Sequence, residues 1–431
     1  MPNLAREPQE RLAADRFHEL FVRFQAVRAT SEAICAPLAI EDFVVQSMPD
    51  VSPPKWHLAH VSWFFEAFIL QPYLRGYQPL DPRYDHLFNS YYQTHGTPFP
   101  RANRGLLSRP TVSQVYSYRQ HVDLAIGDLL AHPPAEYAEE IARRVELGLQ
   151  HEQQHQELLL MDIKHILAQN PLLPAYRSDL RPAPLQAAGM TRWQRYPSGL
   201  RQIGHGGDGF AFDCETPRHR QFLEDFRLAS RPVTNGEYLA FIEDKGYERS
   251  DLWLADGWTL SRQAGWQAPL YWQRVDGAWC EMTLGGLRPL DHEAPVCHVS
   301  FFEADAFASW AGARLPSEAE WEVAAQGMPV RGNFLETDHL QPVAAAPLGE
   351  GPEQLFGDVW EWTASAYRPY PGFRPLPGSL GEYNGKFMSG QMVLRGGCCA
   401  TPQSHVRASY RNFFYPGMRW QFAGLRLARE A

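Results

Sequence analysis

A long amphipathic segment of the chain carries two histidines, His151 and His155, in the run HEQQHQELLLMDIKH. Residues four apart lie on the same face of an α-helix, one turn above the other. Two imidazoles in this arrangement can bind one transition-metal ion, as they do in the helical motif of zinc proteases. The pair therefore favours a helical domain built around a metal site over a helix that carries two histidines by chance.

A second apolar and aromatic run, PPKWHLAHVSWFFEAF, supplies His57 and His60. If this helix packs against the first, three imidazoles can surround one ion and leave coordination positions open for substrate and O2. An open site of this kind is typical of catalysis, whereas a structural zinc site is closed. The residues alone leave either His57 or His60 as the third ligand, and a hydrogen-bonded core histidine is the alternative for each.

The chain has 431 residues, which exceeds one ordinary hydrophobic core and favours two domains. Between residues 10 and 170, apolar residues recur at three- and four-residue spacing, which predicts four long helices. The third is expected to begin after Thr111, a residue suited to the N-cap. Because bundles build metal sites from facing side chains, we predict a four-helix bundle over residues 1–175. The non-periodic segment 77–110 is predicted to be a functional loop.

The second half of the chain has a different pattern. Residues 176–199 contain a Pro-rich stretch and are predicted to be a linker. Over residues 200–431, short apolar segments alternate with Gly, Asp and Pro turns, which indicates an irregular α+β domain. Helices are expected to start near Asn235, within VSFFEADAFASWAGA, and at Ser317, whose side chain would form a capping box with Glu320.

Composition and charge exclude some classes of function. The net charge is −9 and no basic stripe stands out, which argues against nucleic acid as a partner. The N-terminal segment lacks the apolar core of a signal peptide, and no apolar run approaches the length of a membrane span. We therefore expect a cytoplasmic protein without a membrane partner.

The six cysteines are scattered and show no CxxC spacing, so we expect reduced thiols and no disulfide framework. Adjacent cysteines rarely form a disulfide with each other, because the geometry strains the peptide. Cys398 and Cys399 are therefore interpreted as small, partly buried residues that follow a Gly-Gly turn.

Several motifs together resemble a known family. RPVTNGEYLAFI, PVCHVSFFEADAFASWAGARLPSEAEWEVAA, FGDVWEWTASAY, VLRGGCCATP and FAGLRLAR resemble the formylglycine-generating-enzyme-like, or C-type-lectin-like, fold. WHLAH and HEQQHQE resemble the metal-binding runs of DinB-like four-helix domains. The two domains in this order resemble the sulfoxide synthases of ergothioneine biosynthesis, and the closely related selenoneine synthases share the architecture.

The resemblance implies a mononuclear non-haem iron(II) centre held by His60, His151 and His155, because WHLAH matches the family run at its last histidine. It also implies a reaction in which O2 drives the joining of a sulfur donor to C2 of the imidazole of hercynine (Nα-trimethylhistidine). Three neutral imidazoles leave room for imidazole, thiolate and O2 on one ion. A carboxylate ligand would have to be Glu152 or Glu157, and the helical spacing directs Glu157 away from the histidine face.

The resemblance assigns substrate-binding residues as well. Gln154 and Asn412 match positions that hold the trimethylammonium group, and Arg101 and Arg104 match arginines that bind the donor's carboxylates. A quaternary ammonium needs amide oxygens and aromatic faces. The candidate aromatic walls are Phe413, Phe414 and Trp420. The alternatives are core packing for these aromatic residues and surface charge for the arginines.

Three departures from the family bear on the donor. Phe414 stands where some relatives place an acid that contacts γ-glutamylcysteine, which favours free cysteine. No tyrosine precedes Tyr383 in RPLPGSLGEY, so Tyr91 or Tyr92, after FNS, is the expected catalytic proton donor. Cys398 replaces the usual serine, which keeps a selenosugar donor as an alternative.

Three other function classes compete with this interpretation. A formylglycine-generating oxidase is disfavoured, because Cys398 and Cys399 are adjacent, whereas its copper-binding cysteines are separated. A zinc-dependent thiol transferase of the DinB-like type would use the same three histidines without O2. A non-catalytic binding module would need neither His151 nor His155. The sequence does not decide among the donors, between the two tyrosines or among oligomeric states.

Overall fold

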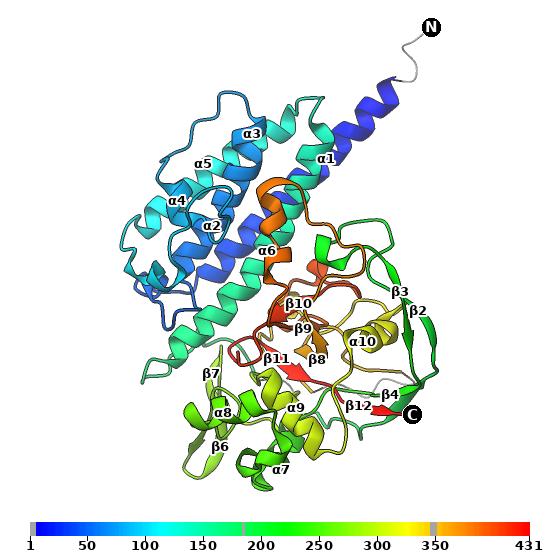
Figure 1. Ribbon diagram of the computed structural model, residues 1–431. Coiled ribbons are helices and arrows are strands. Elements are labelled where there is room, and N and C mark those ends of the chain that lie inside the picture. The colour runs from blue at the N-terminus through cyan, green and yellow to red at the C-terminus, as the bar shows by residue number, and fades with distance from the viewer. Residues whose placement is uncertain (1–5, 183–185, 345–350) are drawn as a thin grey trace. The chain divides into compact units, whose positions relative to one another are not determined.

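The computed structural model describes residues 6–182, 186–344 and 351–431, with side chains described from residue 15 onward. The chain forms two compact units, residues 1–166 and 167–431 (Figure 1). Part of the charged N-terminal segment and part of the predicted linker lie outside the described residues. Each unit is considered separately below.

The first unit is helical, as expected. Its long helices are α1 (Arg6–Cys35), α2 (Pro54–Phe65), α5 (Val112–Ala131) and α6 (Ala138–Ala168), the last of which continues into the second unit. Shorter helices are the π-helical turn Glu66–Leu70 that extends α2, α3 (Gln71–Tyr73), α4 (Tyr84–Phe88) and the 3₁₀ helices Asp42–Val44 and Arg101–Leu106. None of the described helices is long and apolar enough to cross a membrane.

Two ion pairs between α1 and α6 show that these helices run parallel. Arg16 contacts Glu139 at 2.7 Å, and Arg23 contacts Glu146 at 2.6 Å. Both partners advance by seven residues, about two helical turns, so the two helices run parallel. These pairs are exposed and contribute little to stability, but they show the register in which the two helices pack.

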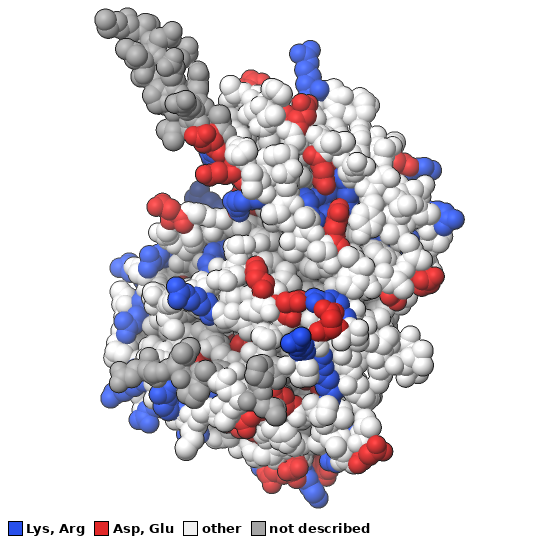
Figure 2. All heavy atoms as spheres, turned by 180° about the vertical axis from the view of Figure 1, so that it is seen from behind, with Lys and Arg blue, Asp and Glu red and all other residues white. Residues whose placement is uncertain are grey.

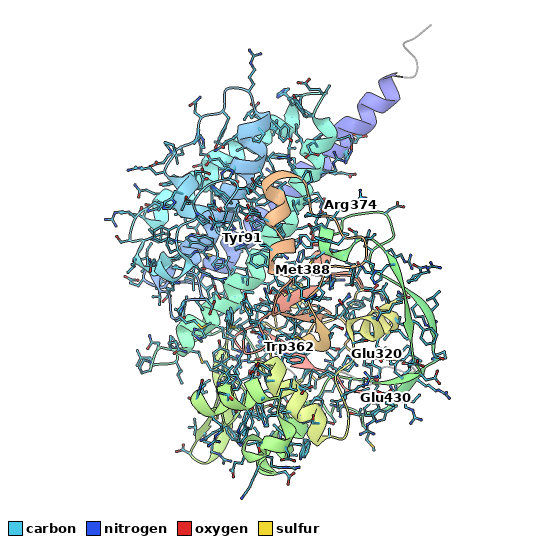
Figure 3. The ribbon with its side chains drawn as sticks, in the orientation of Figure 1. Tyr91, Glu320, Trp362, Arg374, Met388 and Glu430 are labelled. Carbon is cyan, nitrogen blue, oxygen red and sulfur yellow. The ribbon has the colours of Figure 1, made fainter. Side chains whose placement is uncertain are left out.

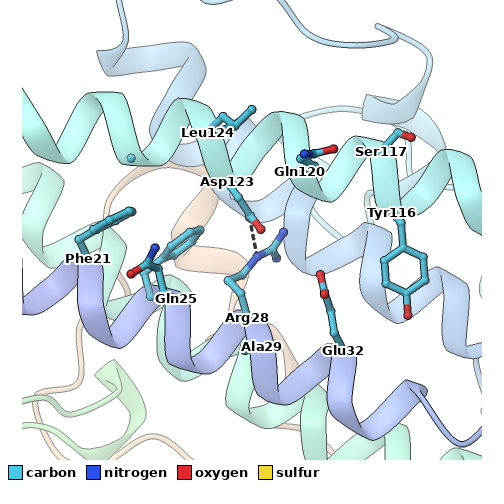
Figure 4. Close-up of a pocket in the computed structure, with 12 residues that line it drawn as sticks. Phe21, Gln25, Arg28, Ala29, Glu32, Tyr116, Ser117, Gln120, Asp123 and Leu124 are labelled. Carbon is cyan, nitrogen blue, oxygen red and sulfur yellow. Dashed lines mark hydrogen bonds and ion pairs between the residues drawn. The ribbon is translucent and has the colours of Figure 1, made fainter.

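Helix α1 runs antiparallel to α5. Arg28 Nε lies 2.7 Å from Asp123 Oδ1, and Arg119 Nε lies 3.3 Å from Glu32 Oε1. The residue numbers rise on α1 while they fall on α5. A groove of about 640 Å³ opens between the two helices, and Figure 4 shows the Arg28–Asp123 contact in it.

The expected start of α5 is confirmed. Thr111 is the N-cap, and its hydroxyl oxygen accepts a hydrogen bond from the Gln114 amide at 3.2 Å. The Gln114 side chain accepts one from the Thr111 amide at 2.8 Å, which completes a capping box. This capping box defines the first residue of α5 and stabilises its first turn.

A glycine allows α6 to approach α2 closely. A Cβ atom added to Gly148 would lie 2.6 Å from Cε1 of Phe65, closer than real Cβ contacts allow. Gly148 lies three residues before His151 on α6, and Phe65 lies five residues after His60 on α2. The absence of a side chain at position 148 therefore sets the distance between the two histidine-bearing helices.

The segment 77–110 is more ordered than its sequence indicates. It contains α4 and the 3₁₀ helix Arg101–Leu106. Just before α4, the Asp81 carboxylate accepts a hydrogen bond from the Arg83 amide at 3.0 Å and forms a local turn. Such local turns depend on single polar side chains and leave no periodic pattern of apolar residues.

The second unit is an irregular α+β domain, as expected. A three-stranded sheet has the order β1-β4-β12 (Trp193–Tyr196, Phe226–Ala229, Ala428–Glu430). A four-stranded sheet has the order β10-β9-β8-β11 (Asn412–Phe414, Met392–Arg395, Trp360–Ala366, Ala423–Leu425). The smaller sheets are β2-β3 (Gly199–Ile203, His219–Leu223) and β5-β6-β7 (Trp272–Val275, Ala278–Thr283, Gly286–Pro289).

Helices α7 (Asn235–Glu243), α8 (Ala255–Gln263), α9 (Phe301–Trp310) and α10 (Glu318–Ala325) accompany these sheets. Three of them occur where the sequence predicts helices. The capping box between Ser317 and Glu320 is present, with the Glu320 amide donating to the Ser317 hydroxyl at 3.2 Å. Figure 3 labels Glu320 on α10 and Trp362 on β8. Acidic and basic side chains are intermixed on the face shown in Figure 2.

Strand β1 lies within the segment that the sequence analysis interprets as a linker. It pairs antiparallel with β4, and the ring of Tyr196 stacks on Phe226 with centroids 4.8 Å apart. Cross-strand aromatic pairs of this kind stabilise short strands. The strand has only four residues and lies in a Pro-containing segment, so the sequence pattern does not indicate it.

The cysteines agree with expectation. All six are described and none forms a disulfide. Cys398 and Cys399 follow Gly396 and Gly397, whose φ angles are +104° and +81°, and they are fully buried where the sequence predicts partial burial. A Cβ atom on Gly396 would lie 2.5 Å from the carbonyl oxygen of Leu355. The turn therefore requires glycine, and the two cysteines pack behind it.

We predict that Gly148→Ala destabilises the helical unit by about 1–3 kcal/mol, because the added methyl group forces α6 away from Phe65. Chemical denaturation measures the change. Gly127→Ala on α5 is the matched control, since its Cβ would meet Phe21 at a milder 3.3 Å. Equal stability of the two variants would show that the Gly148 contact does not limit the approach of the helices.

Candidate metal centre

The structure brings together three of the predicted site residues. One ring nitrogen from each of His60, His151 and His155 lies within 4.8 Å of the others. Nε2 of His60 is 3.2 Å from Nε2 of His151, and the ring centroids of His151 and His155 are 4.7 Å apart. His60 comes from α2 and the other two come from successive turns of α6. The arrangement is the one expected of a His-bearing helix pair.

Hydrogen bonding fixes which nitrogen His60 presents. Its Nδ1 lies 2.6 Å from the carbonyl oxygen of Phe88. A carbonyl only accepts hydrogen bonds, so Nδ1 carries the proton and donates it. Nε2 is therefore left with its lone pair, directed at His151.

His57 occupies a different position from His60. Its Nδ1 lies 2.8 Å from Nδ1 of His155, and its Nε2 lies 3.0 Å from Oδ2 of Asp162. Both ring nitrogens therefore have protein partners. Of the two candidates that the sequence left open, His60 joins the group of three, and His57 lies behind His155.

All three imidazoles of the group are held neutral. Burial lowers the pKa of His151 to about 3. Burial, together with the neighbouring His151 imidazole, lowers the pKa values of His60 and His155 well below their ordinary range. Neutral imidazole is the form that binds metals, and nitrogen donors suit iron, zinc, copper or nickel. The donor set therefore fits a transition metal.

Aromatic rings enclose the imidazoles. Trp56 stacks on His60 with centroids 4.6 Å apart and an interplanar angle of 12°. Trp63 lies 5.5 Å from the same imidazole, and Phe64 lies 4.4 Å from His151. An apolar wall of this kind restricts water and holds the rings in place.

Glu152 is committed to a buried ion cluster. Its carboxylate accepts hydrogen bonds from Arg28 at 3.0 Å, Arg119 at 3.1 Å and Ser31 at 2.7 Å. Although burial by itself raises the pKa of Glu152, Arg28 and Arg119 hold it at about 2. The carboxylate next to His151 is thus an anchor between α1, α5 and α6, and the group of three contains no carboxylate.

The two predicted tyrosines lie side by side in the segment after α4. The Tyr91 and Tyr92 rings stack with centroids 4.5 Å apart, and their hydroxyl oxygens are 3.4 Å apart. Tyr92 is fully buried, and its ring packs 5.6 Å from Trp63. Asn89 holds the turn by accepting from the Tyr92 amide at 2.9 Å. Figure 3 labels Tyr91, which retains partial exposure.

The two predicted arginines differ in their surroundings. Arg101 is exposed, and its guanidinium donates to the Asp50 carbonyl at 2.5 Å. Arg104 is buried, lies 3.3 Å above the Trp56 ring and donates to Ser52 Oγ at 2.9 Å.

Arg104 has no carboxylate within ion-pair distance among the described residues, and its Nε is buried without a hydrogen-bond partner there. Burial and the nearby Arg101 charge lower its pKa well below the ordinary range. The surface-charge interpretation is therefore wrong for Arg104. A buried guanidinium without an acid is suited to receive a ligand carboxylate.

The remaining predicted residues divide between the units. Gln154 is partly exposed on α6, directly before His155. Asn412 and Phe414 project from one face of β10, and Phe413 projects from the other, because side chains alternate along a strand.

Phe413 stacks on Tyr367 with centroids 4.1 Å apart. Phe414 packs edge-on against buried Trp420 at 5.6 Å. Of the three aromatic residues, Phe413 therefore packs away from the face that Asn412 shares with Phe414.

Comparison with known proteins identifies the family of this chain. Residues 190–431 match the model of the sulfatase-modifying factor enzyme 1-like domain. Over 411 residues the chain is 35% identical to a hercynine oxygenase of Mycolicibacterium thermoresistibile, and the match covers 88% of each chain. It is 34% identical over 407 residues to a hercynine oxygenase of Mycobacterium tuberculosis, covering 88% of this chain and 91% of that one. The chain belongs to the hercynine oxygenase family.

This membership confirms the family expected from the motifs of both halves, and the matched model confirms the expected formylglycine-generating-enzyme-like domain. A further relative, the ergothioneine biosynthesis protein 1 of Schizosaccharomyces pombe, is 28% identical over 234 residues, covering 51% of this chain and 28% of that one. Hercynine oxygenase relatives favour the sulfoxide synthase interpretation over the selenoneine synthases.

We predict that Glu152→Gln lowers the free energy of unfolding by about 3–5 kcal/mol, because it removes the fully buried carboxylate that Arg28 and Arg119 share. Each arginine then keeps only one acidic partner, and both of these acids are more exposed than Glu152. Urea denaturation measures the loss. The matched control is Asp123→Asn, which removes the other carboxylate on Arg28 at a partly exposed position and should cost about 1 kcal/mol or less. A loss no larger than that of the control would contradict the anchoring role.

Proposed function

We propose that this protein is an iron(II)-dependent oxidoreductase that joins a thiol, free cysteine, to C2 of the hercynine imidazole and yields a sulfoxide. Family membership with hercynine oxygenases, over most of both chains, is the observation that carries the proposal. The three neutral imidazoles on α2 and α6 support it, because a donor set of three nitrogens leaves positions open for substrates.

The proposed reaction balances with O2 as the oxidant. The C2–H bond of hercynine and the S–H bond of cysteine break, and a C–S bond and an S–O bond form. One oxygen atom enters the sulfoxide, and the other leaves as water with the two hydrogens. The substrates supply the four electrons that reduce O2, so no further reductant is needed.

The metal is proposed to be held by Nε2 of His60 together with His151 and His155. When bound, iron(II) would supply the redox chemistry that reduces O2 and would stabilise the donor as a thiolate. The neutral imidazoles add no charge to the site, and the Trp56, Trp63 and Phe64 rings limit water around it.

The substrate-binding roles follow the residues that match the family. Arg104 is proposed to bind the cysteine carboxylate, because it is buried and lacks an acidic partner among the described residues. Exposed Arg101 is proposed to assist it. In the first unit, Gln154 is proposed to contact the trimethylammonium group of hercynine through its amide oxygen. In the second unit, Asn412 matches a family position with the same role, and Phe414 and Trp420 are the proposed aromatic residues there.

The proposed donor is tested by supplying three alternatives separately. The anaerobic protein is loaded with Fe(II) and hercynine and then given O2 with cysteine, γ-glutamylcysteine or a selenosugar. Mass spectrometry should detect hercynyl-cysteine sulfoxide as the main product. His151→Ala is the matched control and should lose bound iron and turnover together, since one of three ligands is removed.

A selenium adduct formed only with the selenosugar would replace the proposal by a selenoneine synthase. Turnover without O2 after loading with zinc would replace it by a thiol transferase.

The tyrosine pair supplies a second test. We predict that Tyr92→Phe slows sulfoxide formation at least tenfold and diverts the enzyme towards oxidation of the thiol alone, because general-acid catalysis by one side chain is worth roughly 10²–10⁴. Tyr91→Phe is the matched control, since it removes the neighbouring hydroxyl 3.4 Å away from that of Tyr92. The ratio of the two products measures the effect. If neither variant changes the ratio, the proton donor lies elsewhere.

A further inference from the structure

We propose that His57 and Asp162 are positioning residues that hold His155 in the tautomer whose Nε2 faces the metal. This inference rests on the proposed metal site and deepens it by naming residues outside the three ligands. Neither residue joins the group of three nitrogens. Their contacts form a continuous chain from the Asp162 carboxylate through the His57 ring to the His155 ring.

The direction of the chain follows from donors and acceptors. An ionised carboxylate only accepts, so the proton between His57 Nε2 and Asp162 Oδ2, 3.0 Å apart, belongs to His57. A neutral His57 then has an acceptor at Nδ1. The Nδ1 of His155, 2.8 Å away, must donate to it. A His155 ring protonated at Nδ1 presents an unprotonated Nε2.

In His60, a single backbone hydrogen bond selects the same tautomer. The Phe88 carbonyl receives its Nδ1 proton directly. No backbone carbonyl accepts from His155 among the contacts of the described residues, and His57 takes that place. Carboxylate–histidine pairs behind metal ligands orient the ligand ring and raise its basicity.

Asp162 is itself held in position. Its Oδ2 also accepts from the Ser52 amide at 2.8 Å, just before α2 begins. The Ser52 hydroxyl in turn accepts from Arg104 at 2.9 Å. The chain of contacts that starts at His155 therefore ends on the arginine proposed to bind the donor carboxylate.

His57 is buried, and the Trp56 ring packs edge-on against it with ring centroids 6.0 Å apart. The contacts with His155 and Asp162 engage both of its ring nitrogens, so these neighbours set the orientation of the His57 ring.

The test compares two replacements of His57 by metal affinity and does not depend on turnover. The full-length apo-protein is titrated with Co(II), and separately with Fe(II) under anaerobic conditions, against a chromophoric chelator. His57→Leu fills the space but removes both polar contacts. His57→Gln keeps them, because its amide oxygen can accept from His155 while its amide nitrogen donates to Asp162.

We expect His57→Leu to weaken Co(II) and Fe(II) binding by about 10–100-fold and to alter the Co(II) visible spectrum. We expect His57→Gln to recover most of the affinity. Val122→Ala, a core truncation on α5, is the control for stability, and should lower the melting temperature without weakening metal binding.

The outcomes separate this inference from the function on which it rests. Wild-type affinity in His57→Leu, or equal weakening in His57→Gln and His57→Leu, would overturn the positioning role and leave the metal site intact. A wild-type protein that binds neither Co(II) nor Fe(II) would overturn the metal site itself and the proposed function with it.

Discussion

The helical unit depends on one buried carboxylate. Glu152 lies at the centre of the bundle, where Arg28 of α1 and Arg119 of α5 neutralise it and Ser31 completes its hydrogen bonds. Removing the Glu152 carboxylate would leave Arg28 and Arg119 with only the more exposed acids on α5 and α1. Because Glu152 follows His151 directly, the cluster that ties three helices together also fixes where the histidine face of α6 points.

Packing and chemistry share the same short stretch of α6. Gly148 brings the helix against Phe65, and His151 and His155 follow within two turns. On α2, His60 and its stacking partner Trp56 lie one turn apart. Small errors in the approach of these helices would therefore change nitrogen–nitrogen distances as well as core packing, so stability and metal binding are expected to vary together along this stretch.

The sequence predicts those parts of the structure that depend on local spacing. Helical periodicity places His151 and His155 on one face, and capping residues locate the starts of α5 and α10. The sequence indicates Glu152 only as a possible ligand, because its partner Arg28 lies 124 residues away and no local pattern joins the two. The separate roles of His57 and His60 depend on the neighbours of each ring, Asp162 and Phe88, which adjacent positions in a sequence do not reveal.

Most of the cysteines are buried in a protein that is proposed to use a free thiol and O2. Five of the six are buried, and burial raises the pKa values of Cys35 and Cys214 to about 12, so they carry almost no thiolate at neutral pH. Mixed disulfides with a small-molecule thiol require an accessible thiolate. The fold therefore protects these buried thiols from the exchange and oxidation reactions that the proposed substrates would otherwise cause during turnover.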